Sequence, residues 1–411
     1  MSETMPNSGI GSSEIASAPV AVGLGTRPKF KWWWCGIPIA VASVVAIAAV
    51  SVLSFGGYAI VTVLGKIRPL RDAYQYLSRL CDRAVARIGQ KVLRDPRDTP
   101  ALRLMISLTI TALPIFVIQL VLKKPQPLLI VAFYLSLYGF KFQRFVRMFS
   151  AKHLEAHRPK GYFEGAYHTI FGRYMEFFLG YLYGNIPELD RTAHVRLHHR
   201  ENGGIDDVQE SRCYNRTSLV DFGQYLSATI GTVLGLTPYF YFRAHGDEKN
   251  RKSLLWGMAR YYAYVTALFI YDWKLGIAYG LIPILCMNVI TAITAWTQHA
   301  FYDAERPEDY FAHTVTVLDE MNFLNEGYHL CHHHRSSMHW TEMPEHFEEI
   351  RDKMRDSRSL VFRDLDYMQL FIELTVLGRS DVLAEKLIPW EPMSHEQKLE
   401  LLAKRTTVAT G

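Results

Sequence analysis

The sequence predicts an all-α integral membrane protein with an N-terminal span and two transmembrane helical hairpins. Three observations lead to this prediction: long uncharged runs, basic segments between them, and histidines clustered beside them. The uncharged runs cover residues 32–65, 104–122, 222–242 and 275–302. A helix needs about 20 consecutive apolar residues to cross the hydrocarbon core of a bilayer. Such runs argue against a soluble protein, although the mean hydropathy of the 411-residue chain is only +0.01.

The N-terminal part divides into a tail and a long apolar segment. Residues 1–26 lack Lys and Arg and are rich in Ser, Gly, Ala and Pro, so we expect a disordered tail over 1–31. The basic cluster and the apolar run begin too late for a cleaved signal peptide. The run 32–65 suits either one long tilted helix or a hairpin bent near Gly56 and Gly57, and we favour the single span.

Basic segments predict which ends of the spans face the cytoplasm. Segment 66–100 holds nine basic residues against four aspartates, and positive charge concentrates in cytoplasmic loops. Its apolar residues recur every three or four positions, which fits an interfacial amphipathic helix; a solvated charged linker is the alternative. Only three residues separate runs 104–122 and 126–140, which predicts a hairpin turn. The next segment, 141–160, again carries six basic residues, so both flanks of this hairpin are expected in the cytoplasm.

A second hairpin is predicted over residues 253–302, with its turn at residues 272–274. The run 222–242 is interrupted by two glycines and a proline, so it either spans the membrane or lies in the interface. An interfacial position keeps the topology consistent if the second hairpin also returns to the cytoplasm. Residues 303–411 are polar and contain no further span, and we expect 346–411 to form a cytosolic C-terminal tail.

Charge and cysteine content exclude other classes of protein. The net charge of +5 and the pI near 8.8 follow from basic loops beside anionic lipid. No RNA- or DNA-binding motif is present, so no nucleic-acid partner is expected. The five cysteines are scattered and form no CxxC motif, which argues against a disulfide framework. Cys331 lies among histidines, and a metal-ligand role for it is a minor alternative.

The histidines carry most of the functional information. Nine of the sixteen fall at four positions beside the apolar runs. On a helix, residues three or four apart share one face, so each cluster can aim two or three imidazoles at one point. Neutral imidazoles that converge suit a transition metal such as iron or zinc. The nine are His153 and His157 in HLEAH, His194, His198 and His199 in HVRLHH, His299 in WTQHAF, and His329, His332 and His333 in HLCHH.

The clusters differ in how strongly they indicate a metal site. HLEAH alone is weak, because HxxxH is more often two surface histidines, and it does not match the HExxH motif of zinc proteases. HxxxHH is stronger, because adjacent histidines with a partner four residues earlier are rare by composition. A second triple-histidine cluster of similar form on the same predicted side of the membrane is stronger again. Together they predict a metal site.

The order of these clusters resembles the membrane fatty-acid desaturase superfamily, which includes related hydroxylases. HxxxH is followed by 36 intervening residues, HxxxHH, a hydrophobic hairpin and HxxHH, and NEGYHLCHHH resembles the third histidine box of lipid and sphingolipid desaturases. The resemblance covers about residues 101–345, which we take as the catalytic domain. It implies a helical membrane domain topped by a cytosolic helical cap, in which eight or nine histidines hold two non-heme irons. Carried onto this chain, the implied ligands are the nine histidines named above.

The chain departs from the family pattern at one position. In several family members an Asn four residues before the isolated histidine joins the metal site through water, whereas this chain has Ala295 there. Asn325, Glu326 and Asp190 are candidates to orient ligating rings, because such rings normally bond a neighbour through their second nitrogen. His334 extends the third cluster, and the other six histidines are expected to have surface or structural roles or lack supporting context: His168, His313, His339, His346, His245 and His395.

The resemblance implies an oxygen-dependent oxidation of a lipid chain, with two iron ions as cofactor and dioxygen as co-substrate. Removal of two hydrogens would give an alkene, and insertion of one oxygen an alcohol. We favour a fatty-acid or lipid desaturase, with a hydroxylase on the same scaffold as the alternative. A non-enzymatic metal transporter or receptor is more remote, because its ligands would lie inside the spans near the midplane.

The same reading sets the expected partners and location. No heme, flavin or nicotinamide motif is present in the sequence, so we expect an external electron donor, a small heme or iron–sulfur carrier with its reductase. Arg147, Lys152, Arg196 and Arg200 would either steer an acidic carrier or bind lipid head groups. The expected substrate is an acyl chain among the membrane lipids. The membrane would be the endoplasmic reticulum in a eukaryote and the cytoplasmic membrane in a bacterium, with the histidine clusters on the cytosolic side.

Overall fold

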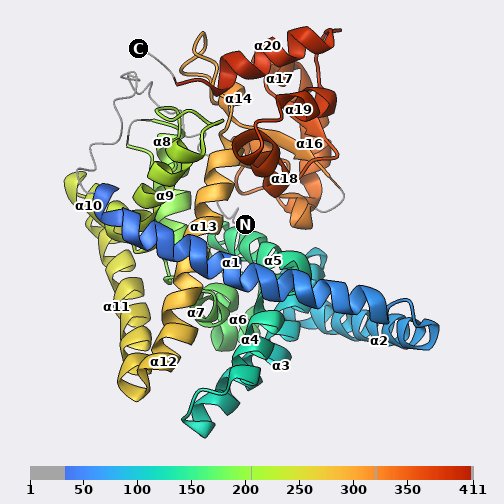
Figure 1. Ribbon diagram of the computed structural model, residues 1–411, viewed down its shortest axis with the longest axis vertical. Coiled ribbons are helices and arrows are strands. Elements are labelled where there is room, and N and C mark those ends of the chain that lie inside the picture. Colours follow the sequence, from blue (N-terminus) through green and yellow to red (C-terminus); the bar gives the residue numbers. More distant parts are fainter. Residues whose placement is uncertain (1–32, 205, 320–321, 409–411) are drawn as a thin grey trace, which may run out of the picture.

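The computed structural model describes residues 33–204, 206–319 and 322–408 (Figure 1). The expected tail over residues 1–31 lies outside them. Within the described residues the fold is helical apart from three short strands. Four helical stretches are long and apolar enough to cross a membrane: Gly36–Leu64, Pro96–Leu122, Pro127–His157 and Trp273–Gln298. The protein is therefore an all-α membrane protein, as the sequence predicts.

Both predicted hairpins are present, and they turn at the same end of the molecule, the bottom in Figure 1. The first pairs α3 (Thr99–Leu122) with α4 (Pro127–Tyr138), and a proline in the first turn starts each helix. The second pairs α11 (Glu248–Tyr271) with α12 (Trp273–Gly276) and α13 (Ile282–Gln298). The stretch that contains α12 and α13 is among the four candidate spans, and α11 is not. Asp272 makes this turn sharp, because its carboxylate accepts hydrogen bonds from the backbone amides of Lys274 and Leu275.

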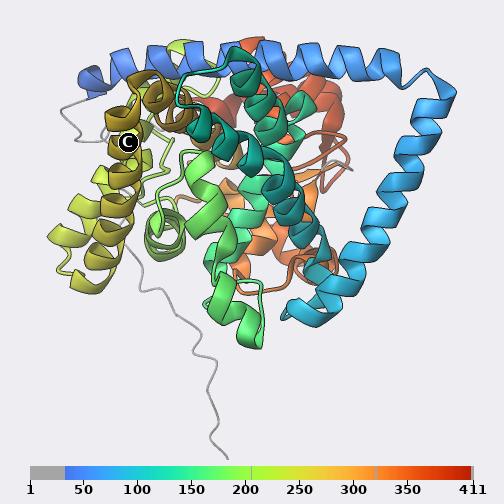
Figure 2. The same cartoon turned by 90° about the horizontal axis from the view of Figure 1, so that it is seen from below.

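The N-terminal apolar run forms one continuous helix, α1 (Trp33–Leu64), and is not bent at its two glycines. Figures 1 and 2 show that α1 runs across the hairpins rather than alongside them. It packs on α13 and on α9 (Leu219–Val233) through small buried residues such as Ser43 and Ala46. A Cβ at Gly36 would lie 2.2 Å from the carbonyl oxygen of Ser227, so the crossing requires glycine at this position.

The run 222–242 does not form a single span. It divides into α9 and α10 (Leu236–Ala244) at Gly235, whose φ of +78° suits glycine. Neither helix is among the four stretches long enough to cross a membrane. This break agrees with the interfacial alternative for the segment.

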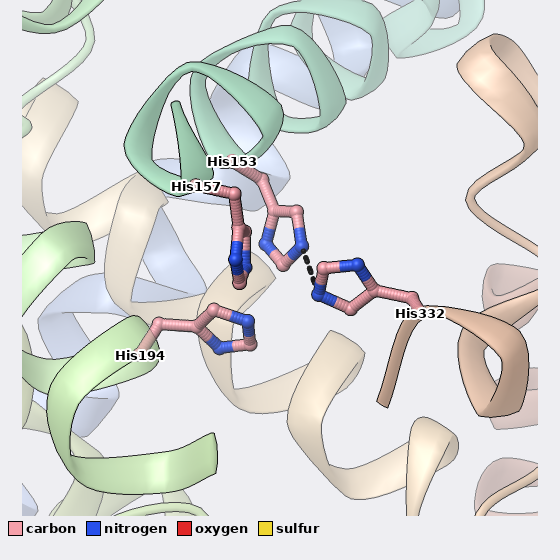
Figure 3. A group of neighbouring side chains, drawn as sticks. All are labelled: His153, His157, His194 and His332. Atoms are coloured by element: carbon pink, nitrogen blue, oxygen red, sulfur yellow. Dashed lines mark hydrogen bonds between the residues drawn. The ribbon is translucent and has the colours of Figure 1, made fainter. Parts of the chain in front are cut away.

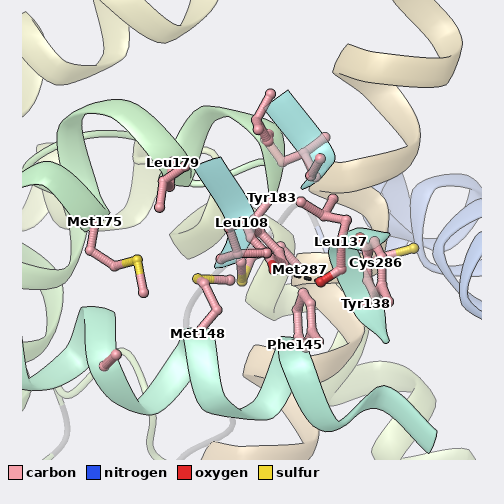
Figure 4. Close-up of a cluster of buried hydrophobic side chains, with 14 of the residues drawn as sticks. Leu108, Leu137, Tyr138, Phe145, Met148, Met175, Leu179, Tyr183, Cys286 and Met287 are labelled. Atoms are coloured by element: carbon pink, nitrogen blue, oxygen red, sulfur yellow. Dashed lines mark hydrogen bonds between the residues drawn. The ribbon is translucent and has the colours of Figure 1, made fainter. Parts of the chain in front are cut away.

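A π-helical segment at Ile277–Leu281 connects α12 to α13, and tyrosines pair with its backbone. A π-turn disturbs the regular i→i−4 bonds, and carbonyls inside a membrane domain need partners from the protein. Tyr134 of α4 donates to the carbonyl of Ala278, and Tyr264 of α11 donates to that of Tyr279 over 3.1 Å. Such polar contacts sit within an otherwise apolar core, part of which appears in Figure 4.

The histidines lie on short elements at the end of the hairpins opposite their turns. α5 (Gln143–His157) follows α4 and ends at the first cluster. The second cluster lies on a π-helical segment, Asp190–His198, which continues into α8 (His199–Glu201). α15 (His329–His334) carries the third. The linking elements are α6 (Gly165–Phe171), a π-turn at Met175–Leu179, α7 (Gly180–Leu182) and 3₁₀ turns at Pro96–Asp98, Phe140–Phe142, Phe323–Asn325 and Trp340–Glu342.

Residues 346–408, for which the sequence predicts a cytosolic C-terminal tail, are folded and pack on residues that precede them in the chain. Strand β2 (Val361–Arg363) pairs in parallel with β1 (Thr316–Leu318) and antiparallel with β3 (Leu387–Ile388). Phe362, Leu387 and Leu402 share one core with Phe301 and Val317. These residues fold onto the rest of the chain because their apolar side chains are buried in this shared core, although the composition of the segment is mostly polar. The helices around this sheet are α14 (Tyr310–His313), α16 (Met343–Glu349), α17 (Arg351–Asp356), α18 (Tyr367–Phe371) with a π-turn at Ile372–Val376, α19 (Ser380–Lys386) and α20 (His395–Thr406).

Arg216 ties this C-terminal region to the histidine-bearing region. Its side chain is fully buried, and its guanidinium donates only to backbone carbonyls. Nε donates to Ala300 over 3.0 Å, and Nη2 donates to Arg405 and to Thr407 over 2.9 Å each. Because Ala300 directly follows His299, the last turn of α20 and the isolated histidine are joined through one side chain.

α2 (Arg68–Val92) has two unlike faces and touches the rest of the protein near its C-terminal end. Its C-terminal half buries Val85 and Gly89 against the start of α3. Nearer its N-terminus, Tyr74 is 73% exposed and Leu77 is 59% exposed. Exposed arginines cover the remaining surface, as in helices that lie at membrane interfaces.

We expect α2 to lie among anionic lipid head groups, with Tyr74 and Leu77 below them. Cys81 is exposed, and Cys213, Cys286 and Cys331 are buried, so an environment-sensitive fluorophore on Cys81 of the Cys35→Ser protein reports on this helix. Its emission should shift to the blue in nanodiscs that contain phosphatidylserine, relative to phosphatidylcholine alone. The double change Arg79→Gln and Arg83→Gln should abolish the shift. Equal emission in the two lipids would contradict this placement.

Arg216→Met should destabilise the protein by about 3 kcal/mol or more, because it leaves several buried carbonyls without a donor. The measurement is thermal unfolding of the detergent-purified protein. Arg351→Met serves as the control, because Arg351 is exposed and pairs only with exposed Glu348. A similar small shift for both variants would show that the buried guanidinium contributes little.

Candidate metal centre

The three histidine clusters and the isolated histidine converge on one buried site. Two groups of four rings have ligand atoms that all lie within 4.8 Å of one another. The first group brings α5, the π-helical segment and α15 together and consists of His153, His157, His194 and His332 (Figure 3). The second group consists of His198, His299, His329 and His333, of which His299 lies at the end of α13.

His199 is the ninth ring and lies next to the first group. Its Nε2 is 2.9 Å from Nε2 of His194 and 3.0 Å from Nε2 of His332. In the second group, Nε2 of His333 is 3.1 Å from Nε2 of His329 and 3.3 Å from Nε2 of His198. The rings thus present the same nitrogen to a common centre.

Local helix geometry explains how His194 and His199 meet although they are five residues apart. In an α-helix, neighbours on one face are three or four residues apart. Here the backbone amide of His199 donates to the carbonyl of His194, the i→i−5 bond of a π-helix. The wider turn places positions 194 and 199 over one another. His153 and His157 need no such change, because α5 is regular and their spacing is four.

The opposite ring nitrogens are held by side chains from the loop after α8. Nδ1 of His198 donates to the carboxylate of Asp207 over 2.8 Å, and both side chains are almost fully buried. Nδ1 of His333 is 3.1 Å from the side-chain oxygen of Asn202. The side-chain amide of Gln209 lies 3.4 Å from Nδ1 of His194. The oxygen atoms of Asp207 and Asn202 accept from Nδ1 of His198 and His333, which fixes these two rings and leaves their Nε2 atoms free to bind metal, as partners of metal-bound histidines do.

This arrangement fits a pair of metal ions. Nε2 of His157 and Nε2 of His299 are buried and have no hydrogen-bond partner among the described residues. The other Nε2 atoms face one another, whereas side-chain oxygens of Asp207 and Asn202 hold the Nδ1 atoms of His198 and His333. A cation at each group would satisfy nitrogens that otherwise lack partners, and neutral imidazole is a ligand for iron and zinc.

Burial keeps the rings in the form that binds metal. Burial, and then repulsion from the neighbouring rings, holds the pKa values of His194, His199, His329 and His333 well below the usual range. Burial likewise lowers the pKa values of His299 and His332 to about 3. These rings are therefore neutral at pH 7, which is the state required of a ligand.

Comparison with known proteins identifies the family. The family model described as fatty acid desaturase matches residues 95–364. The chain belongs to the fatty acid desaturase family. The match spans all nine rings and thus includes both four-histidine groups. No curated protein and no solved structure matches the chain. Membership assigns the protein to desaturase- or hydroxylase-type oxidation of lipids at a membrane.

Other residues considered from the sequence lie in different surroundings. Glu326 lines a small cavity with His153, His329 and His332. Asn325 instead donates to the carbonyl of Trp340 over 2.8 Å, and Asp190 pairs with Lys152 over 2.7 Å.

The residues without an expected ligand role have other contacts. Cys331 is buried in an apolar cluster, and Ala295 packs near Trp296. His313 stacks on Tyr302, His339 bonds Asp98, and His346 bonds His334 and Glu349, whereas His168 is half-buried and His245 and His395 are exposed.

Sequence reasoning missed the three residues that hold Nδ1 atoms: Asn202, Asp207 and Gln209. A signal was present, because they fall within ten residues after the second cluster, in the turn-rich stretch ENGGIDDVQE. Such a stretch can return its side chains to the preceding helix. Spacing on a helix cannot reveal this return, because it depends on loop geometry.

Replacing His198 with Ala should remove bound iron, because it deletes one ring of the second group. Asp207→Asn should weaken iron binding by about 10- to 100-fold, since the carboxylate that orients His198 is lost. Iron content and affinity of the purified protein are measured by elemental analysis at set free-metal concentrations. His395→Ala, an exposed site, should bind iron as the unchanged protein does. Full iron binding by both test variants would overturn the assignment.

Proposed function

We propose that the protein is an oxygen-dependent desaturase that introduces a double bond into a membrane lipid's acyl chain. The observation that carries the proposal is the pair of four-histidine groups, which include rings at the C-terminal ends of α5 and α13, two helices that belong to the apolar stretches. Metal ligands at the ends of these helices can contact an acyl chain that enters from the bilayer. The position outside the hairpins also disfavours a transporter, whose sites lie near the midplane.

The nine histidines are the proposed iron ligands, with His199 beside the first group. When bound, two irons supply the oxidising power that removes hydrogen from an unactivated C–H bond, at the expense of dioxygen and two electrons. The protein contributes the rest. Asp207 and Asn202 hold the rings in orientation, and the surrounding burial limits access of water to the site.

The overall reaction balances with an external reductant. Two hydrogens leave adjacent carbons of the chain, two electrons come from the donor and two protons from solvent, and dioxygen becomes two waters. Hydroxylation on the same scaffold would instead place one oxygen atom in the chain. Desaturation is favoured by the family match, whose description names that activity.

We propose that electrons come from a small carrier that docks near the histidine side of the molecule, which we place in the cytosol. Arg147, Arg196 and Arg200 are exposed and suit the steering of an acidic partner or lipid head groups. Lys152, which the sequence grouped with them, does not belong to this surface. It is only 2% exposed and is held by Asp190 and Asn185.

Lipid analysis of cells that express the protein tests this function. Chains that lose two hydrogens are expected, and they should be absent in cells that express His332→Ala. The purified protein should form product only with oxygen and an electron donor with its reductase. Gain of one oxygen atom would support the hydroxylase alternative, and product without oxygen or without a donor would refute oxidative chemistry.

A further inference from the structure

A small cavity lies beside His194, between the histidine-bearing π-helical segment and helices α9 and α13. Its volume is about 40 Å³. Its apolar wall includes Val233 of α9 and Met287 of α13, and the loop before the second histidine cluster closes it. A cavity at this boundary is where a lipid chain would approach the proposed iron ligands.

We propose that this cavity binds a hydrogen-bonding group of the substrate, a hydroxyl or an amide, within a few bonds of the carbon that is oxidised. The substrate class is therefore a lipid chain attacked near its polar end, and a plain methylene chain attacked far from its head group is excluded. This inference rests on the proposed function.

The first support is a fixed polar wall. Lys152 and Asn185 line the cavity, and each is only 2% exposed. The ammonium of Lys152 is 2.7 Å from the carboxylate of Asp190 and donates to the side-chain oxygen of Asn185 over 2.8 Å. A buried charge pair is costly to maintain beside hydrocarbon alone, whereas it suits a neighbour that is itself polar.

The second support comes from two threonines on the helices that form the apolar wall. Thr232 of α9 and Thr291 of α13 both line the cavity, and neither side-chain hydroxyl has a hydrogen-bond partner in the described part of the chain. Other helical threonines nearby behave differently. Thr229 donates to the carbonyl of Tyr225 over 2.9 Å, one turn earlier, as threonine usually does in an apolar helix.

Free hydroxyls at this place discriminate between substrates. A methylene segment would displace water and leave both hydroxyls unpaired, which disfavours its binding. A hydroxyl or amide would pair with them. Sites built to bond a polar group reject analogues that lack it far more strongly than apolar pockets reject one extra methylene.

The cavity's size agrees with a small group. A single water needs about 10–15 Å³ of such volume, so 40 Å³ holds a group of a few heavy atoms and cannot hold a coiled acyl tail. Because His194 also lines the cavity, the bound group lies next to the first histidine group. The oxidised carbon must then be close to it along the chain.

The test compares two radiolabelled probes with the iron-loaded full-length protein in nanodiscs, corrected for partition into empty nanodiscs. The probes are N-(2-hydroxyethyl)octadecanamide, whose acyl chain ends in an amide and a hydroxyl group, and methyl octadecanoate, which carries the same acyl chain without either donor. Unchanged protein should bind the amide probe at least about tenfold more tightly than the ester. When oxygen, an electron carrier and its reductase are added, mass spectrometry should place the new double bond within a few carbons of the amide. Thr232→Val should reduce that preference about tenfold.

Thr229→Val is the matched control, because this neighbour on α9 already bonds the backbone and does not line the cavity. It should keep the full preference, and Thr291→Val provides a second test variant should Thr232→Val fold poorly. Equal binding of the two probes, or the same preference in all three variants, would overturn the inference. If the protein loads iron and oxidises only the ester far from its head group, the proposed function stands and this inference fails. If iron-loaded protein oxidises no chain at all, the proposed function itself fails.

Discussion

Nine imidazole rings packed around one centre are the constraint on which the rest of the structure depends. Nitrogens that lie 2.9–3.3 Å apart cannot all be protonated, and burial keeps the pKa values of rings such as His194 and His329 low. The polypeptide must hold mutually unfavourable acceptors together from four elements. The π-helical turn before His199, the carboxylate of Asp207 and the buried guanidinium of Arg216 each restrain one part of that arrangement.

A second constraint comes from the membrane, where backbone groups must find partners inside the protein. The helices near the site are irregular: π-turns occur both in the histidine-bearing segment and just before α13. Irregular turns disturb the backbone bonding. Within the bundle, tyrosine hydroxyls such as those of Tyr134 and Tyr264 pair with the carbonyls concerned, so aromatic side chains serve as donors as well as apolar filling.

Local features of the sequence were sufficient to predict the helices, the hairpins and the positions of the nine rings. The length of an apolar run decides whether a helix can cross the membrane. A spacing of three or four residues decides which rings share a helix face, so the sequence alone predicts that the histidines of HLEAH and of HLCHH point the same way. Features that depend on contacts between distant parts of the chain could not be predicted from the sequence. The transverse course of α1, the folding of residues 346–408 onto Phe301 and Val317, and the return of Asp207 to His198 arise from tertiary packing, which composition and periodicity do not encode.

The division between apolar bundle and polar histidine region also explains where selectivity can arise. Hydrocarbon packing distinguishes lipid chains weakly, since one methylene more or less changes binding only modestly. Directional bonds are needed to fix one carbon against the metal centre. Such groups occur at the boundary beside His194, where the apolar side chains of α9 and α13 meet Lys152, Asn185 and two threonine hydroxyls that have no partner among the described residues. The proposed contact at the polar end of the chain would fix its register, and the apolar helices would then need only to accommodate the remainder.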